Sequence, residues 1–236
     1  MFSVRPEDAR EGMDDQTPIV FPGITREDFD SFLNYQFRHI LPRNDENALV
    51  AILNLGHFFQ YDAAQADARL ALEDLNTFRA SRKFILGLRN NIKEWIKDGF
   101  QSLVALPYVE LSWTADIEPM GLHAYHAVVS TRSTIDAHRR LISYVPPPVE
   151  HDASCSFNLG CNIGWRQEWR NKVAMHLMHP DEGLTGEVVL NWLEDVEIND
   201  VNKACKDATI RRLRENRVLT QEEEIVARAL RDLGIA

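Results

Sequence analysis

Three cysteines and one histidine are the residues of this chain whose types best suit metal binding. His151 and Cys155 lie in one short stretch, Cys161 follows it, and Cys205 comes far along the chain. Tetrahedral zinc in proteins is held by thiolate sulfur and imidazole nitrogen, and three cysteines with one histidine complete a set of four ligands. The sequence therefore predicts a structural zinc site at His151, Cys155, Cys161 and Cys205.

The irregular spacing of the cysteines leaves a second interpretation open. Reduced cysteines are among the residues most often buried, and they pack as small hydrophobic side chains. The chain has three cysteines, an odd number, and no apolar segment near Met1 that would serve as a secretory signal. We therefore expect reduced thiols and a cytoplasmic or nuclear protein.

Helix geometry narrows the choice of the fourth metal ligand. If Cys161 opens a helix, His176 and His179 lie more than about 20 Å farther along it, at a rise of about 1.5 Å per residue. They cannot share a metal with Cys161. His151 is the better candidate, because it lies in a loop that can fold back. Two alternatives, if their helix packs alongside, are His126 and His138.

Catalytic signatures are absent from the sequence. It contains no phosphate-binding loop, no nucleophile elbow and no dinucleotide-binding glycine pattern, and no glutamate stands between His176 and His179. We therefore expect a protein that is not an enzyme. The alternative is a small zinc-dependent enzyme that uses the same ligands, with one position open to water beside a carboxylate such as Asp152.

Apolar periodicity predicts a mainly helical fold. Residues 17–21 are expected to form a short strand that ends at the Pro22-Gly23 turn, and Thr25 to cap the first of three short helices. The expected regions are 1–80, a short strand with helices; 81–145, a helical region; 146–161, a Pro-rich connector with the cysteine loop; and 162–236, a C-terminal helical region.

Two helices are expected in the second region. The apolar face from Phe84 to Ile96 predicts one longer helix that ends near Gly99. The proline-free stretch 121–143 predicts another, and three of its residues should face inward. These inward residues are Val128, Ile135 and Leu141.

The C-terminal region carries an aromatic seam. Trp165 and Trp169 are four residues apart, and Val173 and Leu177 continue their face at the same spacing. A continuous apolar face of this kind is typical of a helix packed into a core. The last helix should begin at Thr220 to Glu223 with a capping box, and should end at Gly234.

Composition and charge exclude some functions. With 44% hydrophobic and 26% charged residues the chain is typical of folded globular proteins. A net charge of -10 argues against nucleic acid as a partner, because binding to phosphates needs a basic surface. No stretch approaches the roughly 20 apolar residues that span a bilayer, so we expect no membrane partner either.

Residues 1–80 also carry a family pattern. Its elements are Glu11-Gly12 with Asp14-Asp15, Pro18-Ile19-Val20 before Gly23, Phe29 with Phe32-Leu33, and Gly56-His57-Phe58-Phe59 within the helices of residues 48–75. In pattern and order this region resembles the later part of the BTB/POZ domains of mushroom-type fungi. The C-terminal region resembles the tails of the same proteins, through His138-Arg139-Arg140, the two cysteines before Trp165, and His179-Pro180-Asp181.

The resemblance implies a fold and a function. It implies a mainly α protein with a partial BTB/POZ-like N-terminal region, which lacks the elements that begin such a domain, followed by a helical C-terminal region. The implied function is non-catalytic binding of a protein partner. Because the strand near Ile19 would lack its neighbours, we also expect self-association through the N-terminal region. The remaining alternative is a truncated relic without a selected activity.

Overall fold

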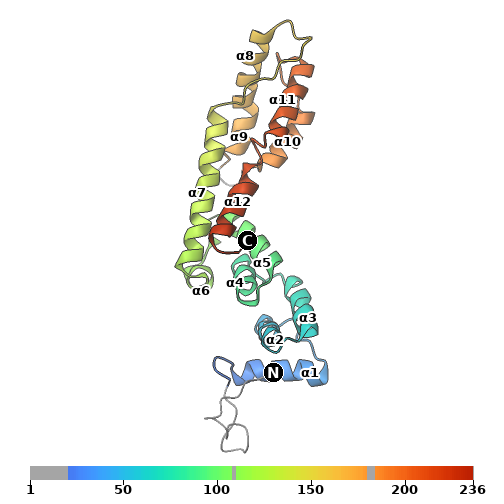
Figure 1. Ribbon diagram of the computed structural model, residues 1–236, viewed down its shortest axis with the longest axis vertical. Coiled ribbons are helices and arrows are strands. Elements are labelled where there is room, and N and C mark those ends of the chain that lie inside the picture. Colours follow the sequence, from blue (N-terminus) through green and yellow to red (C-terminus); the bar gives the residue numbers. More distant parts are fainter. Residues whose placement is uncertain (1–20, 108–109, 180–183, 236) are drawn as a thin grey trace, which may run out of the picture. The chain divides into compact units, whose positions relative to one another are not determined.

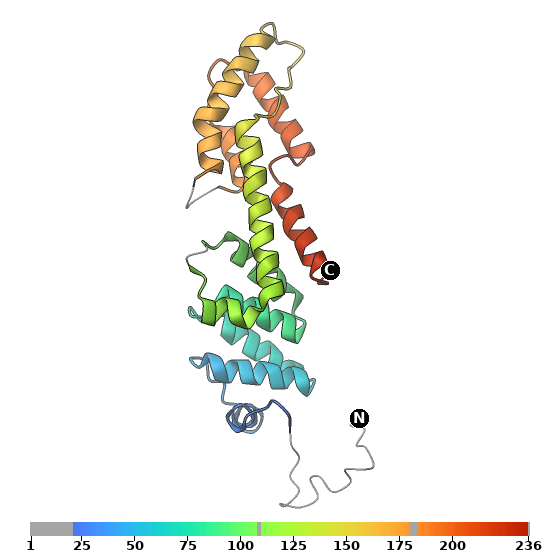
Figure 2. The same cartoon turned by 90° about the vertical axis from the view of Figure 1, so that its left-hand side faces the viewer.

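The computed structural model of the chain describes residues 21–107, 110–179 and 184–235. Within these ranges the regular elements are helices, none is a strand, and 71% of the structure is helical (Figures 1 and 2). The mainly helical prediction is confirmed. Of the expected strand, residues 17–20 lie outside the described part of the chain, and Phe21 is not in a strand. None of the described helices is long and apolar enough to cross a membrane.

The chain divides into two compact units, residues 1–78 and 79–236. The helices of the first unit are α1 (Arg26–Arg38), α2 (Glu46–Phe58) and α3 (Asp62–Glu73). Helix α2 packs against both of the others and is buried along most of its length. Thr25 caps α1 as predicted, since its Oγ1 accepts a hydrogen bond of 3.1 Å from the backbone N–H of Asp28.

The second unit holds the remaining described helices. They are α4 (Ala80–Asn90), α5 (Lys93–Ala105), the π-helical turn η3 (Trp113–Ile117), α6 (Glu118–Met120), α7 (Leu122–Tyr144), α8 (Asn158–Glu168), the π-helical turn η4 (Trp169–Val173), α9 (Ala174–Leu177), α10 (Gly186–Asp195), α11 (Lys203–Glu215) and α12 (Gln221–Asp232). Within this unit α7 is the longest helix. The turn η4 and the helices α9 and α12 run alongside it, and α8 continues beyond its C-terminal end (Figures 1 and 2).

The single long helix expected over Phe84 to Ile96 is wrong, because the chain turns back at Asn91. Asn91 has a φ of 54°, in the left-handed region, which asparagine tolerates better than most residues and which ends a helix. Helices α4 and α5 then pack so closely that a Cβ on Gly99 would stand 2.8 Å from the backbone nitrogen of Phe84. Gly99 therefore serves helix packing inside α5 and does not end a helix.

Helix α7 connects two hydrophobic cores of the second unit. Val128 and Ile135 belong to the proximal core, which α4, α5, α6 and α12 complete. Ile142 belongs to the distal core, which is formed with α8–η4–α9, α10 and α11. The expectation for Leu141 is wrong, since this residue is 63% exposed. Val128, Ile135 and Ile142 follow one another at intervals of seven residues, about two helical turns, which places Ile142 rather than Leu141 on the inner face.

The aromatic seam is buried as predicted. Trp165, Trp169, Val173 and Leu177 are each 1–2% exposed and lie in the distal core. The two indole rings contact each other, with centroids 5.4 Å apart. Each indole N–H donates a hydrogen bond of 2.9 Å, from Trp165 to the carbonyl of Pro147 and from Trp169 to that of Ile142. The π-helical turn η4 lies within the seam.

The predicted capping box of the last helix is not formed. Thr220 precedes α12 but accepts no capping hydrogen bond, and Glu222 of the first turn instead pairs with Arg139 of α7. Gly234, with a φ of 75°, follows α12 in the left-handed conformation typical of helix ends, as predicted.

Removing one ring of the seam should be costly. We expect Trp169→Ala to lower the free energy of unfolding by about 3–5 kcal/mol, because a large cavity opens in the distal core. Urea unfolding monitored by circular dichroism measures this. The matched control is Trp113→Ala, since Trp113 is 62% exposed and its loss should change stability by about 0.5 kcal/mol or less. Equal stability of the two variants would contradict the buried seam.

Candidate metal centre

The four residues predicted as zinc ligands come together from three segments of the second unit. His151 and Cys155 lie in the loop between α7 and α8, Cys161 in the first turn of α8, and Cys205 in the first turn of α11. Two of the three sulfur atoms therefore lie in the first turn of a helix, and the third lies in the loop before α8.

The distances between the donor atoms suit a metal ion. One ligand atom from each of His151, Cys155, Cys161 and Cys205 lies within 4.8 Å of all the others. The Sγ atoms of Cys155 and Cys161 are 3.6 Å apart. In a tetrahedral site with zinc–sulfur bonds of about 2.3 Å, two sulfur atoms stand about 3.8 Å apart. The cluster could hold a metal ion without a large rearrangement.

Backbone amides already point at two of the sulfur atoms. The N–H of Asp152 donates to Sγ of Cys205, and the N–H of Asn202 donates to Sγ of Cys161, each at 3.4 Å. Such donors stabilise negative charge on sulfur. Without a metal, burial still raises the pKa of Cys205 to about 11, whereas the pKa of Cys155 is lowered, chiefly by a hydrogen bond from the backbone of Phe157.

The His151 ring has a nitrogen atom that is available to bind a metal ion. Its Nδ1 atom is buried and has no hydrogen-bond partner in the described structure, whereas its Nε2 stands 3.1 Å from the side-chain amide of Asn162. Buried polar atoms rarely stay unpartnered. A metal on Nδ1 would leave the ring proton on Nε2, and a half-turn of the Asn162 amide would present its Oδ1 as the acceptor.

The loop is held in place by contacts that need no metal. The N–H of Glu150 donates to Oγ1 of Thr209 at 2.9 Å, and the carboxylate of Glu150 forms an ion pair with Arg212. Asp152 accepts from the N–H and the hydroxyl of Ser154, which also lower the pKa of its carboxyl. The Glu150 contacts hold the loop against α11, and the Asp152 contacts hold a turn within the loop.

Burial of the four ligands is uneven. Cys161 and Cys205 are 3% and 0% exposed, whereas His151 and Cys155 are half-buried. The cluster therefore has a closed side toward the helices and a side toward the surface of the loop. The carboxylate of Asp152 is turned to Ser154 at that surface, so it already has partners.

The other histidines considered from the sequence do not join the cluster. His126 is exposed on α7, and His138 of the same helix contacts the carbonyl of Val218 at 3.1 Å. His176 packs edge-on against Trp192. His179 is exposed at the end of the segment that begins with α8, outside the cluster, as expected from its distance from Cys161 along the segment.

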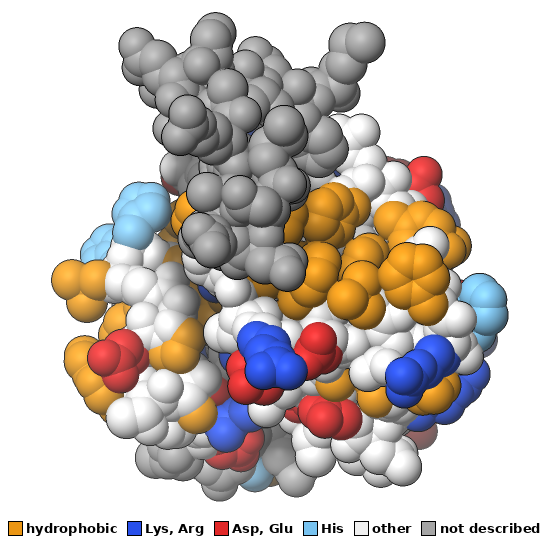
Figure 3. Space-filling model, turned by 90° about the horizontal axis from the view of Figure 1, so that it is seen from below, with side chains coloured by type: hydrophobic (Ala, Val, Ile, Leu, Met, Phe, Trp, Pro, Cys, Tyr) orange, Lys and Arg blue, Asp and Glu red, His pale blue; other side chains and the backbone are white. Residues whose placement is uncertain are grey.

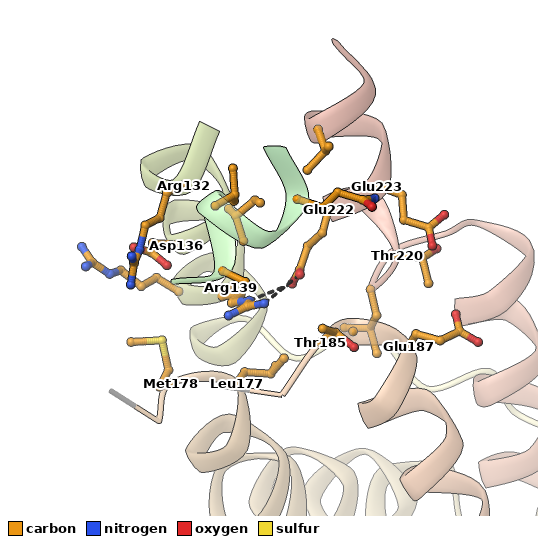
Figure 4. Close-up of a pocket in the computed structure, with 18 of the residues that line it drawn as sticks. Arg132, Asp136, Arg139, Leu177, Met178, Thr185, Glu187, Thr220, Glu222 and Glu223 are labelled. Carbon is orange, nitrogen blue, oxygen red and sulfur yellow. Dashed lines mark hydrogen bonds and ion pairs between the residues drawn. The ribbon is translucent and has the colours of Figure 1, made fainter. Parts of the chain in front are cut away.

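A hollow elsewhere in the same unit was not foreseen from the sequence. It has a volume of about 570 Å³ and is lined mainly by residues of α5, α7, α10 and α12. Figure 4 shows Arg139 and Glu222 joined inside it, by two hydrogen bonds of 2.7 Å, with Arg132 and Asp136 on the α7 side. These bonds are the main reason that the pKa of Arg139 is raised. No sequence signal links two residues 83 positions apart.

Comparison with known proteins finds no protein-family model, no curated protein and no solved structure that matches this chain. The BTB/POZ resemblance therefore stays a prediction from the sequence.

The contact between His151 and Asn162 makes a specific prediction. Asn162→Ala should weaken zinc binding by about 10- to 100-fold, because residues that orient a metal-binding histidine contribute on this scale. Competition with a chromogenic chelator measures the affinity. The matched control is Asn171→Ala, an exposed asparagine farther along the same helical segment. An Asn162→Ala variant with the parent's affinity would show that the amide does not orient the ring.

Proposed function

We propose that His151, Cys155, Cys161 and Cys205 bind a structural zinc ion. The observation that carries the proposal is a complete set of four protein donor atoms within 4.8 Å of one another. Three thiolates with one imidazole form a common donor set of structural zinc. Catalytic zinc sites keep one position for water, and a site with four protein ligands has none to spare. This supports a structural ion over the zinc-enzyme alternative.

The ion would act as a cross-link of the distal core. Cys205 belongs to α11, whereas the other three ligands lie more than forty residues earlier, in the loop and in α8. The loop that carries His151 and Cys155 has no hydrophobic cluster of its own. Val149, near its start, packs against the distal core. A metal bond would therefore fasten a segment that hydrophobic burial holds only at one end.

We further propose that the chain is a non-catalytic protein that binds a protein partner. Four protein donors would leave a tetrahedral zinc no position for water, and Arg139 in the hollow already pairs with Glu222. Exposed large apolar side chains, in contrast, occur in both units. Where such side chains gather into one patch they are typical of a protein interaction surface, and the net charge of -10 favours a protein over nucleic acid as the partner.

Self-association through the first unit is part of this proposal. Phe37 and Phe58 are 76% and 54% exposed, and Ile40 lies near the end of α1 with 55% exposure. Figure 3 shows hydrophobic side chains gathered on one face of the molecule. Phe58 also contacts Phe21 and Phe59, so its ring extends an aromatic cluster to the surface. A second copy of the chain could bury Phe37 and Ile40 at the end of α1, or the exposed part of Phe58 at the end of α2.

The zinc proposal predicts the metal content and its effect on stability. The purified chain should carry one zinc per molecule, and Cys205→Ser should lose it. Zinc at a thousand times its dissociation constant should add about 4 kcal/mol to the free energy of unfolding, and a strong chelator should remove this gain. Elemental analysis and thermal unfolding measure the two effects. His126→Ala, which changes an exposed histidine outside the cluster, serves as the control and should keep its zinc. A parent chain without zinc, equally stable with and without added metal, would refute the proposal.

Self-association predicts a change in molecular mass. Light scattering of the full chain should show a mass above that of a monomer at high concentration, and Phe37→Glu should shift it toward the monomer by placing charge in the apolar contact. Leu122→Glu is the matched control, since Leu122 lies in the second unit and is 75% exposed, against 76% for Phe37. A monomeric parent chain at every concentration would rule out association through this surface.

A further inference from the structure

Two of the cysteines in the cluster are close enough to react with each other. The Sγ atoms of Cys155 and Cys161 are 3.6 Å apart, and a disulfide bond has a length of about 2.05 Å. Cys155 lies in the loop before α8, outside any helix, whereas Cys161 is fixed in the first turn of α8. Bond formation therefore requires a shift of a loop residue and leaves the helix in place.

The two sulfur atoms differ in their access to solvent. Cys155 is half-buried and is flanked by Ser154 and Ser156, which are exposed. Cys161 and Cys205 are 3% and 0% exposed. A small oxidant that arrives from solution reaches Cys155 first, and the buried Cys161 is then in position to resolve the product.

We propose that this cluster is a redox-controlled metal site, in which a hydroperoxide oxidises Cys155 and the Cys155–Cys161 disulfide then releases the ion. The inference rests on the zinc site proposed above. It adds that oxidation would remove the metal cross-link between the loop before α8 and helix α11.

The chemistry balances in two steps. The Cys155 thiolate attacks one oxygen of hydrogen peroxide, so that an S–O bond forms and the O–O bond breaks; the hydroxide that leaves takes a proton and becomes water. The Cys161 thiolate then attacks the sulfur of the Cys155 sulfenic acid, which forms the S–S bond and breaks the S–O bond. The second hydroxide also takes a proton and becomes water. Two thiolates lose two electrons in total, and the peroxide gains them.

The disulfide removes half of the donor set. Cys205 and His151 remain, and two protein ligands do not complete the tetrahedral set that zinc takes in structural sites. Release of the ion also ends the link between the loop and α11 that passes through the metal. A dithiol reductant reverses the step, because thiol–disulfide exchange returns both cysteines to thiols.

The test uses the full chain loaded with one zinc per molecule. Hydrogen peroxide is added in modest excess, a chromogenic chelator reports the free zinc, and peptide mass spectrometry identifies the cysteine products. We expect loss of the whole bound zinc together with a Cys155–Cys161 disulfide, and recovery of zinc binding after dithiothreitol. Dimedone, which traps sulfenic acid, should label Cys155 first.

A matched variant separates the route of attack. Cys155→His keeps four potential ligands but removes the most accessible thiol of the cluster. Peroxide should release zinc from this variant at least about tenfold more slowly than from the parent chain. Zinc loss at the parent's rate, or first labelling at Cys161 or Cys205, would overturn the assignment of Cys155. A zinc-loaded parent chain that keeps its metal and free thiols in peroxide would overturn the redox control alone. A chain that binds no zinc at the outset would overturn the zinc site and this inference together.

Discussion

Two indole hydrogen bonds at the end of α7 set the course of the chain through the second unit. The N–H of Trp169 donates to Ile142 in the last turn of α7, where carbonyls have no partner within the helix, and the N–H of Trp165 donates to Pro147 in the connector. A buried indole needs an acceptor, and these carbonyls need donors. The prolines stop α7, and the tryptophans then hold the connector against α8. These two hydrogen bonds therefore fix the N-terminal end of the loop that carries His151 and Cys155.

The positions of His151, Cys155 and Cys205 relative to one another depend indirectly on these two indole hydrogen bonds. From Pro147 the chain reaches Glu150, whose amide binds Thr209, and Asp152, whose amide binds the sulfur of Cys205. Each contact brings the loop nearer to α11, and α11 is itself packed into the distal core through Ile210 and Leu213. The donor atoms are therefore brought together by protein contacts, so a metal would bind to a largely prepared site and little of its binding energy would be spent on ordering the loop.

Local patterns in the sequence predicted what depends on neighbouring residues. The cap at Thr25 and the seam of Trp165 and Trp169 follow from spacing along one helix, and the cysteine set follows from ligand chemistry. The predictions were wrong where contacts with a distant segment of the chain determine the local structure. Asn91 turns left-handed because α5 packs back on α4, and Glu222 pairs with Arg139 of a distant helix. Asp116 shows the same limit, since this carboxylate is 1% exposed and pairs with Arg79, 37 residues earlier.

The π-helical turn η4 makes the length of its helical segment as important as its side chains. A step of four residues overshoots one α-helical turn by about 40°, so a straight α-helix would carry Leu177 well away from the face of Trp165. The wider turn at Trp169–Val173 takes up this drift, and all four seam residues stay in the distal core. Loss or gain of a single residue here would rotate the half with Cys161 against the half with Leu177 by about 100°. The segment can therefore accept many substitutions on its outer face, but not an insertion or a deletion. The number of residues between Cys161 and Leu177 fixes how the candidate metal ligands are oriented relative to the distal core.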